Sequence, residues 1–210
     1  MRRFTTVLAM TATAGEEDPL EPLWKKAREA VARNDIPGVM FIWKSLADKG
    51  VWQICAGIGK FYEQGAPGVE RNTEQALYWY RRAVFEGDDP VAHLGLGRAY
   101  YNGTGVQSDF AVALKHFQNA FRQGLLEAGI YLGLMHYRGV AVTQDLQRAE
   151  EFFSAAASAD FPLAYTYLAR VALTKWQPVK AVRLFFKAAV LGVRIAKADP
   201  GDQRLLGLKL

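Results

Sequence analysis

Apolar and small residues recur along the chain at three- and four-residue spacing, which places them on one face of an α-helix. Between residues 92 and 124 two such stripes follow one another. Their members are Ala92, Leu96, Tyr100 and Gly103, and then Ala113, Phe117, Ala120 and Gly124. Small residues in both stripes let two helices approach closely, and the aromatic side chains fill the remaining space. The pattern predicts a helical hairpin.

The same stripes return 36 residues further along the chain. Leu96 recurs as Leu132 and Leu168, and the same offset carries Phe117 onto Phe153. One hairpin cannot bury both of its faces, so neighbouring hairpins are expected to stack into an all-α superhelical solenoid. We predict about five hairpins within residues 20–192, namely a degenerate unit at 20–50 and units at 54–90, 91–126, 127–162 and 163–192.

The segments outside the hairpins are short. Residues 1–19 carry Arg2 and Arg3, a brief apolar stretch and Ala12-Thr13-Ala14, a weak version of an export signal. We interpret them as a frayed leader of a cytoplasmic protein, with export to the periplasm as the alternative. Residues 193–210 contain Asp199-Pro200-Gly201, which should break the helix before several leucines. We expect them to fold back as an apolar C-terminal cap.

The loop inside the hairpin, YYNGTGVQSD, contains two glycines and an aspartate. It lacks G-x-x-x-x-G-K-[ST], and no strand precedes it, so a phosphate-binding loop is excluded. Gly103 suits the left-handed turn at a helix end, and Gly105 suits a tight reversal. Asp109 stands where a side chain caps the next helix. We interpret the loop as a joint between helices.

The pattern A-x-x-x-L-G-x-x-Y-x-x-G-x-G-V-x-x-D-x-x-x-A-x-x-x-F-x-x-A-x-x-x-G, read from Ala92 to Gly124, resembles the Sel-1-like repeat, a relative of the tetratricopeptide repeats. The resemblance implies a right-handed α-solenoid that serves as a scaffold or adaptor, in bacteria often beside secretion, cell-envelope, signalling or toxin-immunity systems, and it implies no catalytic residues. His136, Ala141 and Asp160 depart from the pattern, and the last loop is shorter. We therefore expect the third and fourth full units to pack or turn differently.

No constellation of residues indicates catalysis. The three histidines, His93, His116 and His136, fall on different helices or repeats, so we expect no metal site and no cofactor. His136 occupies a core position and is expected to be a buried, hydrogen-bonded histidine. Cys55, the single cysteine, is expected to be a packed thiol. The alternative is an enzyme or small-ligand receptor that uses the repeat frame as a pocket.

Binding of another protein is the function that the surface favours. In a solenoid the first helix of each hairpin lines the concave face, and the positions two, six and nine residues after the leading alanine lie opposite its core stripe. The predicted partner-binding residues at or beside such positions are Lys60, Leu94, Arg98, Tyr101, Leu134, Tyr137, Arg138 and Arg170. Tyrosine and arginine are enriched in binding hot spots. The alternative is that these side chains contact the next hairpin.

The charge is uneven, because residues from 161 onward carry nine basic and two acidic side chains. Four of these basic residues form a stripe if the helix continues past Gly192, and they are Lys180, Arg183, Lys187 and Arg194. This anionic-partner stripe could bind an acidic protein, lipid headgroups or a polyanion; the bland alternative is a solvated outer face. No aromatic residues interleave the charges, so nucleic acid is not expected as a partner. We expect a monomer or weak dimer.

Overall fold

The computed structural model describes residues 19–199 and 201–205, and within them the chain is helical apart from loops and one isolated bridge between Ala66 and Val69. Contacts divide the chain into two compact units, Met1–Ser108 and Asp109–Leu210. The all-α fold is therefore confirmed. Most of the expected leader, and Leu206, Leu208 and Leu210 of the expected cap, lie outside the described residues.

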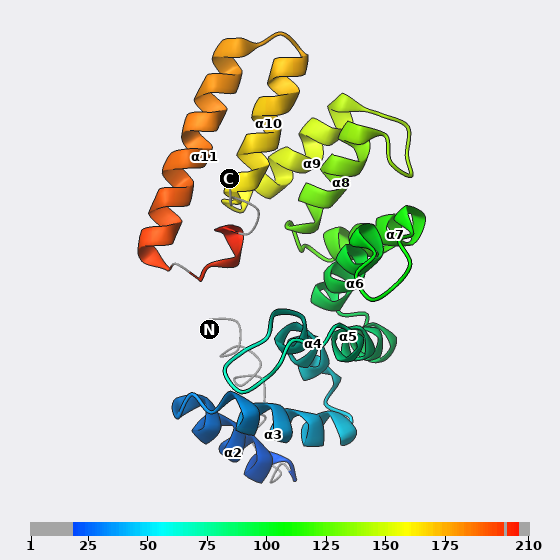
Figure 1. Ribbon diagram of the computed structural model, residues 1–210, viewed down its shortest axis with the longest axis vertical. Helices are drawn as coiled ribbons and strands as arrows, with labels where there is room; N and C mark the ends of the chain where they lie inside the picture. The colour runs from blue at the N-terminus through cyan, green and yellow to red at the C-terminus, as the bar shows by residue number, and fades with distance from the viewer. Residues whose placement is uncertain (1–18, 200, 206–210) are drawn as a thin grey trace. The chain divides into compact units, whose positions relative to one another are not determined.

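Unit 1 is built from antiparallel pairs of helices around one core (Figure 1). Its elements are α2 (Glu21–Ala32), α3 (Ile36–Asp48), η1 (Trp52–Ile54), α4 (Cys55–Gln64), α5 (Thr73–Gly87) and α6 (Pro90–Asn102). Helix α2 packs on α3, α4 on α5, and α5 on α6. Val39, Trp43 and Leu46, which lie at helical spacing in the predicted degenerate unit at 20–50, are buried on α3.

Unit 2 continues the same construction. Its elements are α7 (Phe110–Arg122), α8 (Ala128–Arg138), α9 (Leu146–Ser158), α10 (Pro162–Thr174), α11 (Pro178–Ala198) and η2 (Gln203–Leu205). Phe117 of α7 and Phe153 of α9 are fully buried, and each stacks on a tyrosine of the following helix, Tyr131 at 4.6 Å and Tyr167 at 5.1 Å between ring centroids. One aromatic pair thus joins each second helix to the next first helix.

The joints between helices follow the local chemistry of the loops. Gly103 ends α6 with φ +69°, and the Asp109 carboxylate accepts hydrogen bonds from the backbone N–H groups of the first turn of α7. Ala141 stands where the earlier loop has Gly105, yet it adopts nearly the same left-handed φ, +59° against +70°. At this loop, therefore, the expectation of a different turn was wrong.

Helix α11 runs without a break past Gly192 to Ala198, as the stripe of basic residues required. Asp199 ends it in an extended conformation, and η2 then packs against both α10 and α11. Leu205, at the end of η2, is half-buried.

Candidate functional site

In each unit we call the surface that carries the predicted partner-binding residues the first-helix face; it lies on α4 and α6 in unit 1 and, separately, on α8 and α10 in unit 2. Two of these predictions were wrong, because Leu94 on α6 and Leu134 on α8 are buried, with 4% and 8% of their surface exposed. Both helices are apolar around most of their circumference, and the burial of Ile130 beside Leu134 shows the same effect. In these helices, residues opposite the core stripe are therefore not necessarily exposed to solvent.

Arg98 on α6 is held within the protein. Its guanidinium donates to both carboxylate oxygens of Glu63 on α4, at 2.6 and 2.5 Å, and the Tyr80 hydroxyl donates to the same carboxylate at 2.8 Å. Burial, reinforced by Glu63, holds the pKa of Tyr80 well above its usual range. Arg98 thus ties successive hairpins together and has little capacity left for a partner. Lys60 and Tyr101 are half-buried on the same face.

Unit 2 offers a more accessible part of the first-helix face. Arg138 at the end of α8 and Arg170 on α10 are both exposed. The Arg170 guanidinium lies 5.8 Å from the ring centroid of Tyr167, and Tyr137 is half-buried against the core cluster of α8 to α11. Unit 2 therefore presents two exposed cationic groups on α8 and α10, and one of them, Arg170, lies over an aromatic ring.

The basic stripe lies on one helix, but its members differ in their surroundings. Lys180 donates to Glu150 of α9 at 2.8 Å, and Lys175, before α11, donates to the same carboxylate at 2.6 Å. Hydrogen bonds from the two lysines lower the pKa of Glu150. Lys187, Arg183 and Arg194 are all exposed on α11, and the Lys187 ammonium lies 4.5 Å from the centroid of the Tyr165 ring. Lys180 therefore has a structural partner that spacing alone could not reveal.

The buried polar and thiol groups have structural surroundings. Burial raises the pKa of Cys55 to about 11, as a packed thiol requires. His136 is buried as expected and stacks on Phe152 at 5.5 Å, but among the described residues its Nδ1 has no hydrogen-bond partner. The expected hydrogen bond is thus missing at that nitrogen. Burial, with a smaller effect of Arg148, lowers the pKa of His136, so the ring is neutral at pH 7.

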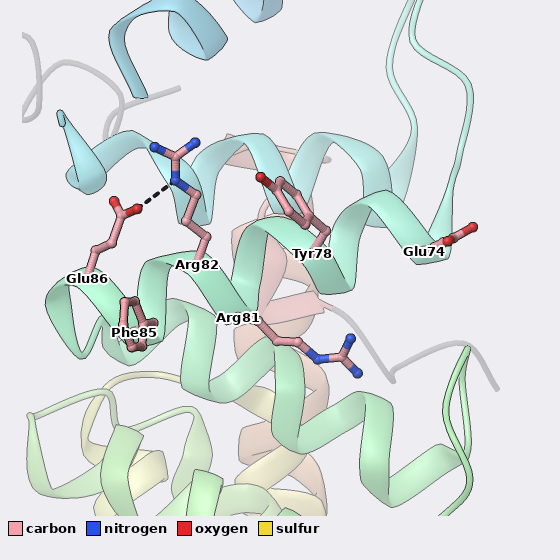
Figure 2. A pocket seen from close by; sticks show the side chains of 6 residues that line it. All are labelled: Glu74, Tyr78, Arg81, Arg82, Phe85 and Glu86. Atoms are coloured by element: carbon pink, nitrogen blue, oxygen red, sulfur yellow. Dashed lines mark hydrogen bonds and ion pairs between the residues drawn. The ribbon is translucent and has the colours of Figure 1, made fainter. Parts of the chain in front are cut away.

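An open hollow of about 530 Å³ lies on the surface of α5 (Figure 2). Its lining residues come from that one helix and are Glu74, Tyr78, Arg81, Arg82, Phe85 and Glu86. Arg82 already donates to Glu86, to Asp48 and to the Ala47 carbonyl. The hollow therefore lacks the enclosure and convergent polar groups that a ligand receptor would need.

The described residues contain neither a cluster of metal ligands nor a membrane-spanning helix. No group of three or more histidine, cysteine, aspartate or glutamate side chains there is placed to hold a metal ion. No helix among them combines the length and the apolar character needed to cross a bilayer.

Comparison with known proteins gives one family over most of the chain. The Sel1 repeat family matches residues 55–87, 90–125, 127–161 and 163–193. The ERAD-associated E3 ubiquitin-protein ligase component HRD3A of Arabidopsis thaliana is 30% identical in an alignment of 161 positions that covers 69% of this chain and 23% of HRD3A. Its relative HRD3B is 29% identical over 161 residues, or 26% of that protein. The chain thus spans about a quarter of the length of these curated relatives.

Solved structures agree on the fold. The Sel1 repeat protein from Oxalobacter formigenes aligns with a TM-score of 0.66 and 25% identity, over 87% of this chain and 84% of that one. The immunity protein Pa5087 from Pseudomonas aeruginosa aligns with a TM-score of 0.53 and 23% identity, over 87% and 70% of the two chains. At that identity the second likeness shows the fold alone.

Proposed function

Because the chain belongs to the Sel1 repeat family, whose repeats are protein-interaction scaffolds, we propose that it is a non-catalytic adaptor that binds one protein partner through the first-helix face. The observation that carries this proposal is the exposed pair of arginines, Arg138 and Arg170, on neighbouring helices of unit 2. The proposal is narrower than the sequence prediction, because Leu94 and Leu134 are buried and Arg98 is engaged by Glu63.

The chemistry of these arginines defines the partner. A guanidinium presents parallel N–H donors that match a carboxylate, and an aromatic ring beneath it restricts its motion and reduces the entropy lost on binding. Tyr167 supplies such a ring beneath Arg170. We therefore expect the partner to present an acidic segment to α8 and α10.

The test replaces both arginines by alanine and compares the double variant with wild type and with Arg148→Ala. Arg148 is a matched control because its side chain is 66% exposed on the second helix α9. Each protein is used as bait in a native lysate of the source cell, and recovered proteins are quantified by mass spectrometry. Loss of two hot-spot contacts should reduce recovery of the partner about tenfold or more.

The outcome that contradicts the proposal is equal recovery of every protein on wild type and on the double variant. Tyr137 is a poorer target, because it packs against the core cluster and its loss would disturb folding as well as the surface. Following the family resemblance, we expect the partner to belong to a secretion, cell-envelope or toxin-immunity system and to meet this protein in the cytoplasm. Fractionation of the source cell tests the location.

A further inference from the structure

The outer face of α11 carries an exposed apolar seam. Its members are Val179, Val182, Phe186, Ala189 and Val193, at positions i, i+3, i+7, i+10 and i+14. All five side chains are exposed, and 71% of the Phe186 surface is accessible to solvent. Alternating steps of three and four residues are the spacing with which one helix packs along another. The seam spans about 21 Å, the length of four helical turns.

The repeat itself shows what usually covers the edge of this seam. Phe185 stands in the same position of its hairpin as Phe153 does on α9. Phe153 is completely buried because Tyr167 of the following helix stacks on it, whereas Phe185 is 39% exposed. Ala157, buried on α9, likewise corresponds to exposed Ala189. In this fold, then, the exposed edge of a second helix is covered by the following helix, which contributes an aromatic side chain.

The exposed apolar surface of α11 extends from the seam to neighbouring Val190, which is 51% exposed, and so beyond what repeat packing requires. The residues of α9 that correspond to Phe186 and Val190 are Ser154 and Ser158, and both serines are exposed. Polar residues therefore suffice at these positions when they face water. Two large apolar side chains at the same positions of α11 indicate a surface that is covered by something else.

The charged residues beside the seam indicate the charge of the partner that covers it. Helix α11 contains five basic residues and no acidic residue. Arg183, Lys187 and Arg194 follow one flank of the seam, and Arg183 and Arg194 are exposed there. A second copy of α11 in antiparallel pairing would bring like charges together, which opposes self-association.

We infer that the outer face of α11 is a second docking surface, and that its occupant is an amphipathic helix of a partner protein with an aromatic and aliphatic seam flanked by glutamate or aspartate. The apolar seam supplies the contact area, and the basic flank fixes orientation and selects the partner by charge. This surface is separate from the first-helix face, so the loss of one leaves the other intact.

The test uses two synthetic helices of about 20 residues whose apolar positions are those of α10, including a tyrosine at the position of Tyr167. One has glutamates along the flank that meets the basic residues, and the other has lysines. Binding of each labelled peptide to the full-length protein is followed by fluorescence anisotropy. The glutamate peptide should bind at least about tenfold more tightly than the lysine peptide, since several charge pairs change sign.

Variants then assign the binding to the seam and to its flank. Phe186→Glu should weaken the binding of the glutamate peptide at least about tenfold. Phe85→Glu, at a 90% exposed phenylalanine of unit 1, should leave the affinity for this peptide unchanged. Arg183→Glu with Arg194→Glu should reverse the preference between the two peptides. Circular dichroism establishes that each variant is folded, which is expected because the replaced side chains are exposed.

Four results with the peptides and the variants would overturn the inference. They are failure of the folded wild type to bind the glutamate peptide at 100 µM, equal affinity for both peptides, binding that Phe186→Glu leaves unchanged, and a concentration-dependent dimer that Phe186→Glu abolishes. Vesicles of phosphatidylglycerol serve as the remaining probe. If wild type binds these vesicles more tightly than the peptide, with the same dependence on Phe186, the surface is a membrane-binding face instead.

Discussion

The contact between Gly133 on α8 and Phe153 on α9 offers a decisive test of how the hairpins are packed. A Cβ atom on Gly133 would lie 2.5, 2.6 and 2.9 Å from three carbons of the Phe153 ring. Favourable carbon contacts are about 3.5–4.0 Å, so a methyl group would overlap the ring by about 1 Å. The ring cannot easily retreat, because it is fully buried and stacked on Tyr167.

Two effects of Gly133→Ala oppose each other. Alanine in a helix interior is more favourable than glycine by about 1 kcal/mol, which would stabilise the protein. Forcing an extra methyl group into a close-packed core costs about 1–3 kcal/mol. Three ring atoms are affected, and the ring is held on its other face. We therefore expect the packing cost to exceed the gain in helix propensity, and the free energy of unfolding to fall by about 1–2 kcal/mol. The melting temperature should fall by about 2–8 °C.

Thermal and urea denaturation followed by circular dichroism measure this loss. Phe153→Leu provides the matched control, since a smaller side chain leaves room for the new methyl group. The double variant should then lose less stability than the two single variants added together, by about 1 kcal/mol. A Gly133→Ala protein that is as stable as wild type, or more stable, would refute the packing argument.

Three further predictions concern single side chains. Asp109→Ala should destabilise the protein by about 1 kcal/mol in urea denaturation because it removes the cap of α7, while Asp109→Asn should retain most of the stability. Cys55 should react with a thiol reagent about a hundredfold more slowly in the native protein than in urea, since its raised pKa leaves that much less thiolate; equal rates would show that the thiol is accessible. Glu150→Gln should lower stability at pH 7 by about 0.5 kcal/mol. The pKa of Glu150 is depressed in the folded state, so this contribution is present above the usual pKa of glutamate and is lost as the pH falls through the folded value; a difference from wild type that persists at pH 2 would contradict its assignment to the ion pairs.

The repeat register could be predicted from the sequence because its signals are local or periodic. The spacing of Leu96, Leu132 and Leu168 marks successive first helices, and each of the three lies buried on one. Gly103 and Asp109 act within a few residues of themselves, so their roles at a helix end and a helix start follow from backbone geometry.

The candidate sites were predicted less well, because exposure depends on neighbours that are distant in sequence. The pairs between Arg98 and Glu63 and between Lys180 and Glu150 join residues 35 and 30 positions apart. They exist only once the hairpins have stacked. The repeat does predict the position of Tyr167, the ring beneath Arg170. Tyr167 lies 36 residues after Tyr131, and Tyr131 stacks on Phe117 in the preceding repeat.

By itself, the sequence determined where helices begin and end and which stripe of each faces its hairpin partner, since these properties depend on hydrogen bonds and side-chain spacing within one repeat. The tertiary structure decided which of the remaining positions meet water. Leu94 is buried although it lies off the stripe, whereas Phe186 is exposed although it is apolar. Helical periodicity defines a direction around a single axis, but solvent exposure is set by how many neighbouring helices surround that axis.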